Sequence, residues 1–128
     1  MSILSSTFAC QTHTYQSAPT TALDVYKPAN HCPASRHKTL ILFHGGGLTT
    51  GSRDVFIPVG IATQLLNRGW IVISADYSLL PQASGLSLLR NLANIETWIT
   101  ENAAKEGIDT TNVAVGGESA GGYMSILA

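Results

Sequence analysis

Three short, largely apolar runs alternate with longer segments in which apolar residues recur at helical spacing. The runs are TLILF from Thr39, WIVISA from Trp70 and NVAVGG from Asn112. Strands that are apolar on both faces are typical of a parallel sheet covered by helices on each side, because a sheet with one face in water alternates apolar and polar residues. This pattern predicts an α/β fold with a doubly wound, mostly parallel sheet.

The segments between the runs are predicted to be the helices of two βαβ crossovers. Their apolar stripes are Ile57, Ile61 and Leu65 in the first segment and Leu88, Leu92, Ile95 and Ile99 in the second. Ser52 or Asp54 is a candidate cap for the start of the first helix, and Gly69 and Gly107 are expected to end the two helices.

The region before the first apolar run has a different pattern. Residues 6–15 and 20–27 mix β-branched and aromatic residues with polar ones on either side of Pro19, which predicts an antiparallel pair of half-exposed strands near an edge. Residues 27–38 are polar and contain two prolines, so a surface loop is expected there. A length of 128 residues leaves room for one domain.

The charge and hydropathy of the chain exclude several classes of partner. Only 12% of the residues are charged and the formal net charge is −1, so there is no basic stripe of the kind that nucleic acid or an acidic membrane surface requires. No apolar stretch approaches the roughly 20 residues that span a bilayer, and the first ten residues lack the pattern of a secretion signal. We expect a cytoplasmic protein without a membrane span.

The residues that bind metals and nucleotides in other proteins are not suitably spaced here. Cys10 and Cys32 are expected to be reduced and buried, and the four histidines do not fall at metal-ligand spacings with them, so no metal is predicted. Ser52 stands where a P-loop needs lysine, and neither glycine cluster forms the G-x-G-x-x-G dinucleotide fingerprint. No cofactor is predicted.

The third apolar run leads into GGESAGG, which fits the motif G-x-S-x-G with Ser119 at its centre. In this motif the serine occupies a cramped strand-to-helix turn, where a Cβ at Gly117 or Gly121 would collide with neighbouring backbone. The next helix is expected to begin at Ala120, so its free amides and positive dipole end would face the serine hydroxyl. Ser119 is therefore the candidate nucleophile.

A second glycine cluster, HGGG, follows the first apolar run. Glycine lets a ligand approach the main chain closely. The amides of Gly45, Gly46 and Gly47 are candidate donors, together with the amide of Ala120, to an oxyanion formed at the serine. His44 is expected to orient this loop by hydrogen bonding and is not taken as the catalytic base.

HGGG, DYSLLPQ at 76–82 and AVGGESAGG at 114–122 resemble the hormone-sensitive-lipase type of α/β-hydrolase, also called α/β-hydrolase fold-3. The middle motif of that family usually reads DYRLAPE, so Ser78, Leu80 and Gln82 depart from it. Glu118 replaces the family's usual Asp, a form that is also similar to type-B carboxylesterases. Asp76 is interpreted as holding a loop through its amides.

This resemblance implies that residues 1–128 are the amino-terminal part of a single α/β-hydrolase domain. The family's sheet begins with strands in the order 1-2-4-3-5, and the chain is expected to supply these five, with 113–117 as an exposed apolar edge. The implied reaction is hydrolysis of a small-molecule carboxylic ester through an acyl-serine intermediate.

The acid and histidine of the catalytic triad follow the serine along the chain in α/β-hydrolases, but residues 120–128 contain neither. The isolated chain is therefore predicted to be inactive. Three hypotheses stay open, in this order of preference. The chain is the amino-terminal half of a carboxylesterase, shortened naturally or by a gene model; it is a non-catalytic binding module; or a second chain supplies the missing strands and triad residues.

Overall fold

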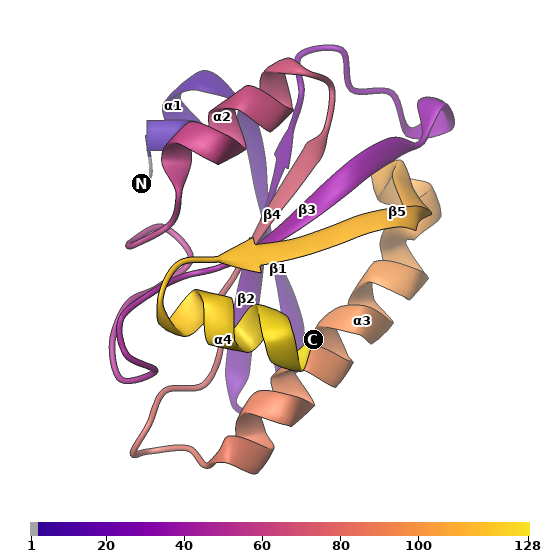
Figure 1. Cartoon of the computed structure of the whole chain (residues 1–128). Helices are drawn as coiled ribbons and strands as arrows, with labels where there is room; N and C mark the ends of the chain where they lie inside the picture. The colour runs from indigo at the N-terminus through magenta and orange to yellow at the C-terminus, as the bar shows by residue number, and fades with distance from the viewer. Residues whose placement is uncertain (1–2) are drawn as a thin grey trace.

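The computed structural model describes residues 3–128 (Figure 1). Its strands are β1 (Ala9–Ser17), β2 (Thr20–Lys27), β3 (His37–Phe43), β4 (Ile71–Ala75) and β5 (Ile108–Gly117). Its helices are α1 (Ile3–Thr7), α2 (Val59–Asn67), α3 (Gly85–Glu106) and α4 (Ala120–Leu127), with a short 3-10 helix, η1 (Pro33–Ser35). In this described part of the chain, no helix is long and apolar enough to cross a membrane.

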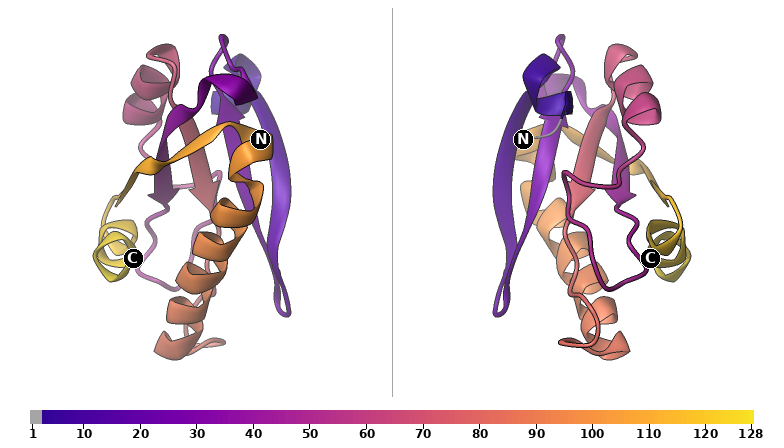
Figure 2. Two further views of the ribbon diagram at one scale, coloured as in Figure 1. Left: turned by 90° about the vertical axis from the view of Figure 1, so that its right-hand side faces the viewer. Right: turned by 90° about the vertical axis from the view of Figure 1, so that its left-hand side faces the viewer.

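The five strands form one sheet in the order β1-β2-β4-β3-β5. β3 pairs in parallel with both β4 and β5, whereas β2 is antiparallel to both β1 and β4. β2 is thus the one strand that runs against the others, which confirms a mostly parallel sheet with an amino-terminal antiparallel pair. Figure 2 shows the β1–β2 hairpin at one edge of the molecule and α4 beside the opposite edge.

Helices cover both faces of the sheet, as its largely apolar central strands require. Alternate residues of β3 point to opposite faces: Ile41 and Phe43 pack in the core beneath α3, whereas Leu40 and Leu42 pack in the core beneath α1 and α2. Met124 of α4 joins the first of these cores. The expected doubly wound arrangement is confirmed.

The helix between the first two apolar runs differs from its prediction in phase and in its cap. Pro58 occupies the N-cap position of α2 without a side-chain hydrogen bond, so neither Ser52 nor Asp54 caps it. The buried residues of the helix are Ala62 and Leu66, while Ile61 is 57% exposed. The predicted stripe is therefore wrong at Ile61, whereas Ile57 and Leu65 pack partly buried against the core beneath α2.

The helix between the second and third runs follows its predicted stripe closely. Leu88, Ile95 and Ile99 are buried on α3, and Leu92 packs against the same core. Gly107 ends the helix in the left-handed conformation, with φ 78°, as expected.

The amino-terminal region and the cysteines differ in part from expectation. β1 begins only at Ala9, because the residues before it form α1, whose Leu4 is buried in the core beneath α2. The predicted surface loop holds η1 and is largely exposed. Cys10 and Cys32 are unpaired as expected but are exposed rather than buried, because they lie on the edge strand and in this loop.

Candidate active site

The glycine loop and Ser119 lie at the same edge of the sheet because the strands that precede them end together. Phe43, the last residue of β3, is in register with Gly117, the last residue of β5, and with Ala75, the last residue of β4. Loops that follow the carboxyl ends of parallel strands meet at one edge, where ligands bind in open α/β sheets.

Ser119 occupies a strained turn between β5 and α4. Its backbone has φ 53° and ψ −117°, a conformation that costs a non-glycine residue about 1–3 kcal/mol. A Cβ at either Gly117 or Gly121 would overlap the carbonyl oxygen of Phe43. This is the collision that the motif predicts, and it explains why glycine occupies both positions.

The first turn of α4 leaves an unpaired amide beside the serine. Within residues 3–128, the amide of Ala120 has no hydrogen-bond acceptor, whereas the amide of Gly121 donates to the Glu118 carbonyl at 2.8 Å. Ser119 itself is exposed, and no hydrogen bond engages its hydroxyl within the same residues. The Ser119 hydroxyl and the Ala120 amide thus both lack a hydrogen-bond partner among these residues.

The glycine loop lies directly beside this turn. A pocket of about 320 Å³ is lined by Gly45, Gly46, Thr50, Phe56, Glu118 and Ser119. Gly46 and Gly47 have φ 117° and 66°, which side chains disfavour, and their amides lack acceptors among the described residues.

Gly45 does not have the role that the sequence suggested. Its amide donates to the Phe56 carbonyl at 3.0 Å, so it is not free to donate to an oxyanion. The acceptor, Phe56, lies where the loop returns to the sheet, outside the glycine motif, so the motif alone does not indicate this hydrogen bond. Of the four predicted donors, the amides of Gly46, Gly47 and Ala120 have no acceptor among the described residues.

His44 is buried and turned toward its own loop. Its Nδ1 lies 2.7 Å from the Gly45 carbonyl oxygen, and because a carbonyl can only accept, Nδ1 carries the proton. Its ring stacks on that of Tyr77 at 4.2 Å between centroids, and the Tyr77 hydroxyl donates to the His44 carbonyl at 2.7 Å. Burial raises the pKa of Tyr77 to about 12, which keeps this donor protonated.

Arg53, which the sequence reasoning overlooked, ties the returning loop to the sheet. Its Nε lies 2.9 Å from Oδ1 of Asp24, its Nη1 pairs with Asp76, and its backbone amide donates to Oδ1 of Asp76 at 2.7 Å. Asp76 therefore holds a loop through an amide, as expected. No local motif marks Arg53, because its partners come from β2 and the end of β4.

A protein-family model described as BD-FAE matches residues 23–128, which is most of the chain. The chain belongs to the BD-FAE family. Carboxylesterase NlhH of Mycobacterium tuberculosis is 36% identical over 88 residues, which are 69% of this chain and 27% of that relative.

Solved structures of an esterase from Thermogutta terrifontis share the fold. The propionate-bound form has a TM-score of 0.81 and 26% identity, over 91% of this chain and 43% of that one. The form phosphorylated by paraoxon has a TM-score of 0.80 and 25% identity, over 91% and 45% of the two chains. These matches confirm the resemblance to α/β-hydrolase fold-3 esterases, a family of ester hydrolases. The chain spans less than half the length of each of these relatives.

The BD-FAE chain brings no histidine ring into hydrogen-bond contact with Ser119 among its described residues. Besides His44, His13 lies 3.5 Å from the Glu106 carboxylate, His31 contacts the Glu106 carbonyl, and His37 contacts the Gly69 carbonyl.

Residues 3–128 contain no cluster of three or more His, Cys, Asp or Glu side chains that could hold a metal.

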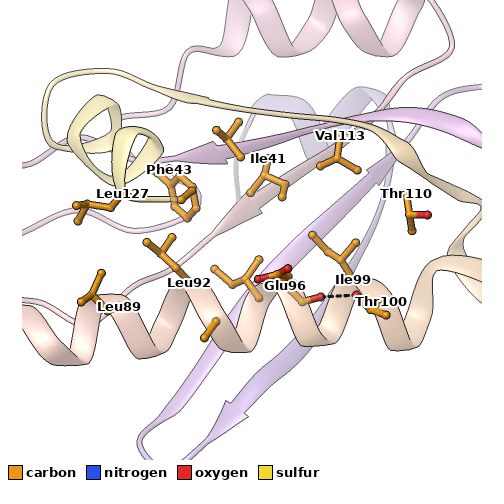
Figure 3. A pocket seen from close by; sticks show the side chains of 14 residues that line it. Ile41, Phe43, Leu89, Leu92, Glu96, Ile99, Thr100, Thr110, Val113 and Leu127 are labelled. Carbon is orange, nitrogen blue, oxygen red and sulfur yellow. Dashed lines mark hydrogen bonds between the residues drawn. The ribbon is translucent and has the colours of Figure 1, made fainter.

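A second pocket of the BD-FAE chain is separate from the serine. It measures about 530 Å³ and lies between α3, α4 and the sheet, where Ile41, Phe43 and Val113 face Leu92 and Leu127 (Figure 3). β5 forms the edge of the sheet beside it, and Val115 is 41% exposed. This edge and groove form an uncovered apolar surface, as the sequence predicts for 113–117.

We expect the buried His44 to make folding stability depend on pH. Burial lowers the pKa of His44, although the Gly45 carbonyl opposes this effect. An unfolded histidine binds a proton near pH 6.5, whereas the buried ring does so only at lower pH, so acidification favours the unfolded state. Stability due to this group is present above about pH 6.5 and is lost as the pH falls toward the pKa of the folded state.

Urea unfolding at pH 7.5 and pH 5.0 measures this effect. The native chain is expected to lose more free energy of unfolding between the two values than His44→Gln does, because other titrating groups are common to both. Equal losses in the two proteins would show that His44 is not responsible.

Proposed function

We propose that Ser119 is the nucleophile of a carboxylic ester hydrolase. One observation carries this proposal: an exposed serine in a strained strand-to-helix turn shares a pocket with the glycine loop, and unpaired amides flank it. Amides held in place before the reaction stabilise developing negative charge without having to reorganise. The carboxylesterase relative and the paraoxon-phosphorylated esterase support the same chemistry.

In the proposed reaction, Ser119 Oγ attacks the ester carbonyl carbon while a base takes its proton. The carbonyl oxygen becomes an oxyanion that accepts hydrogen bonds from Gly46, Gly47 and Ala120. Collapse of this adduct breaks the bond to the alcohol, which leaves with the proton, and forms acyl-Ser119. Water then attacks the acyl group by the same route, which releases the carboxylic acid and restores the serine.

We further propose that the base and its acid lie on polypeptide beyond these 128 residues, either continuous with them or on a complementing chain. The relatives are more than twice as long as the segments that they share with this chain. The unpaired edge of β5 and the apolar groove beside α4 are surfaces that further strands and helices would cover.

A non-catalytic binding module is the second candidate. It is favoured because a serine nucleophile needs a base, and each of the four histidine rings contacts a group other than Ser119. Such a module would hold an ester or a carboxylate on the same amides without cleaving it.

Hydrolysis of p-nitrophenyl butyrate distinguishes the two candidates. The 128-residue chain is compared with the same chain joined to the part of NlhH that follows its matched segment. We expect turnover by the joined protein and none above background by the chain alone. A joined protein that folds, as judged by circular dichroism, and yet shows no turnover would favour the binding module.

A further inference from the structure

Phe56 adopts a backbone conformation that an aromatic residue rarely tolerates. Its φ is 62°, and a bulky side chain in this region is a clear outlier. The conformation directs its carbonyl toward the Gly45 amide, at 3.0 Å. Such strain persists only where the surrounding structure imposes it, and it occurs most often at functional sites.

The side chain of Phe56 is 59% exposed, although it could be expected to avoid water. A single exposed aromatic residue is ordinary. This one, however, lines the same pocket as Ser119, and it is the one bulky apolar side chain among the six lining residues. Its neighbour Val55 is also exposed, at 44%, but does not line the pocket.

We propose that Phe56 determines substrate specificity by forming the apolar wall against which the acyl chain of the ester packs. The inference rests on the proposed function, because it places an ester carbonyl between Ser119 and the amides of Gly46 and Gly47. A Cβ built on Gly45 would lie 3.7 Å from Phe56 Cβ, so the ring is attached beside the start of that loop.

The acyl chain is assigned to this wall, rather than the alcohol, for a chemical reason. The acyl group stays attached to Ser119 between the two halves of the reaction, whereas the alcohol leaves after the first half. One aromatic wall in a pocket of about 320 Å³ suits short acyl groups, since the other five lining residues offer little apolar surface.

Binding of product carboxylates tests this role without requiring a catalytic base. Acetate, butyrate and hexanoate are titrated into the 128-residue chain, and amide resonances are followed by NMR. We expect all three to shift the amides of Gly46, Gly47 and Ala120. The Kd should fall from acetate to butyrate by about twofold to fourfold per methylene, as partly or fully buried methylenes require.

In Phe56→Ala, the Kd for acetate should stay within about twofold of the native value, while the dependence on chain length disappears. Phe56→Leu should restore part of that dependence, and Val55→Ala is the matched control that should leave it intact. The wall is disproved if Phe56→Ala keeps the native dependence, or if Val55→Ala removes it equally. Should acetate shift none of the three amides, the proposed oxyanion site itself would fail.

Discussion

Ser119→Ala is expected to lower kcat for p-nitrophenyl butyrate by about 10⁶-fold in a protein that contains the complete triad, here the chain joined to the remainder of NlhH. Alanine removes the hydroxyl oxygen that is proposed to form the acyl intermediate. The oxyanion donors stay in place, so a residual acceleration of about 10³-fold over water is expected to survive. Initial rates with purified protein measure both quantities.

Ser125→Ala is the matched control for this substitution. Ser125 lies on the same helix, and its hydroxyl donates to the Gly121 carbonyl at 2.8 Å instead of facing the pocket. Its variant should retain kcat within about threefold, since a hydrogen bond of this kind contributes only about 1 kcal/mol to stability. A rate that depends on Ser125 as strongly as on Ser119 would refute the assignment of the nucleophile.

Gly121→Ala is expected to destabilise the 128-residue chain by about 3 kcal/mol, the upper part of the range for overpacking. The added Cβ would overlap the carbonyl oxygen of Phe43 and come within 3.0 Å of the His44 carbonyl oxygen. Both are backbone atoms of β3 and the loop after it, so they cannot move aside as a side chain would. Urea unfolding followed by circular dichroism measures the loss.

Gly60→Ala is the control for this second prediction. Gly60 lies in α2, and a Cβ there would meet nothing within 4 Å. Alanine should stabilise that helix by about 0.5–1 kcal/mol, because glycine has more conformational entropy to lose on folding. If Gly121→Ala were as stable as the native chain, α4 would have to pack farther from β3 than the structure places it.

The rotation of α2 on the sheet is a property that the sequence pattern does not predict fully. The existence of α2 between two apolar runs was predictable, but its buried face was predicted only in part. Leu65 packs against the core, whereas Ile61 points to solvent and Ala62 and Leu66 are the buried residues. Helical periodicity determines the spacing of a stripe. Its phase depends on the loop that leads into the helix, and this loop is held by Arg53 through carboxylates on other elements.

Within the candidate site, the turn at Ser119 could be predicted from the sequence, whereas the position of Phe56 could not. The strand-to-helix turn at Ser119 is local, so the spacing of Gly117 and Gly121 was enough to predict the turn, although the backbone that crowds both glycines includes the carbonyl oxygen of Phe43 on β3. The occupied amide of Gly45 and the exposed ring of Phe56 depend on a loop that folds back eleven residues later. No pattern in the intervening polar residues indicates that return.

The apolar runs and the helical spacing between them were enough to predict the α/β class and the crossovers, and the motif around Ser119 was enough to predict the strained turn. The resemblance of three motifs implied the ester-hydrolase family, because each motif is a continuous stretch of sequence. Only the tertiary structure decided which amides stay unpaired and which side chain borders the serine. Those properties arise from hydrogen bonds and packing between segments far apart in the chain, and a local sequence pattern does not predict which distant segments will meet.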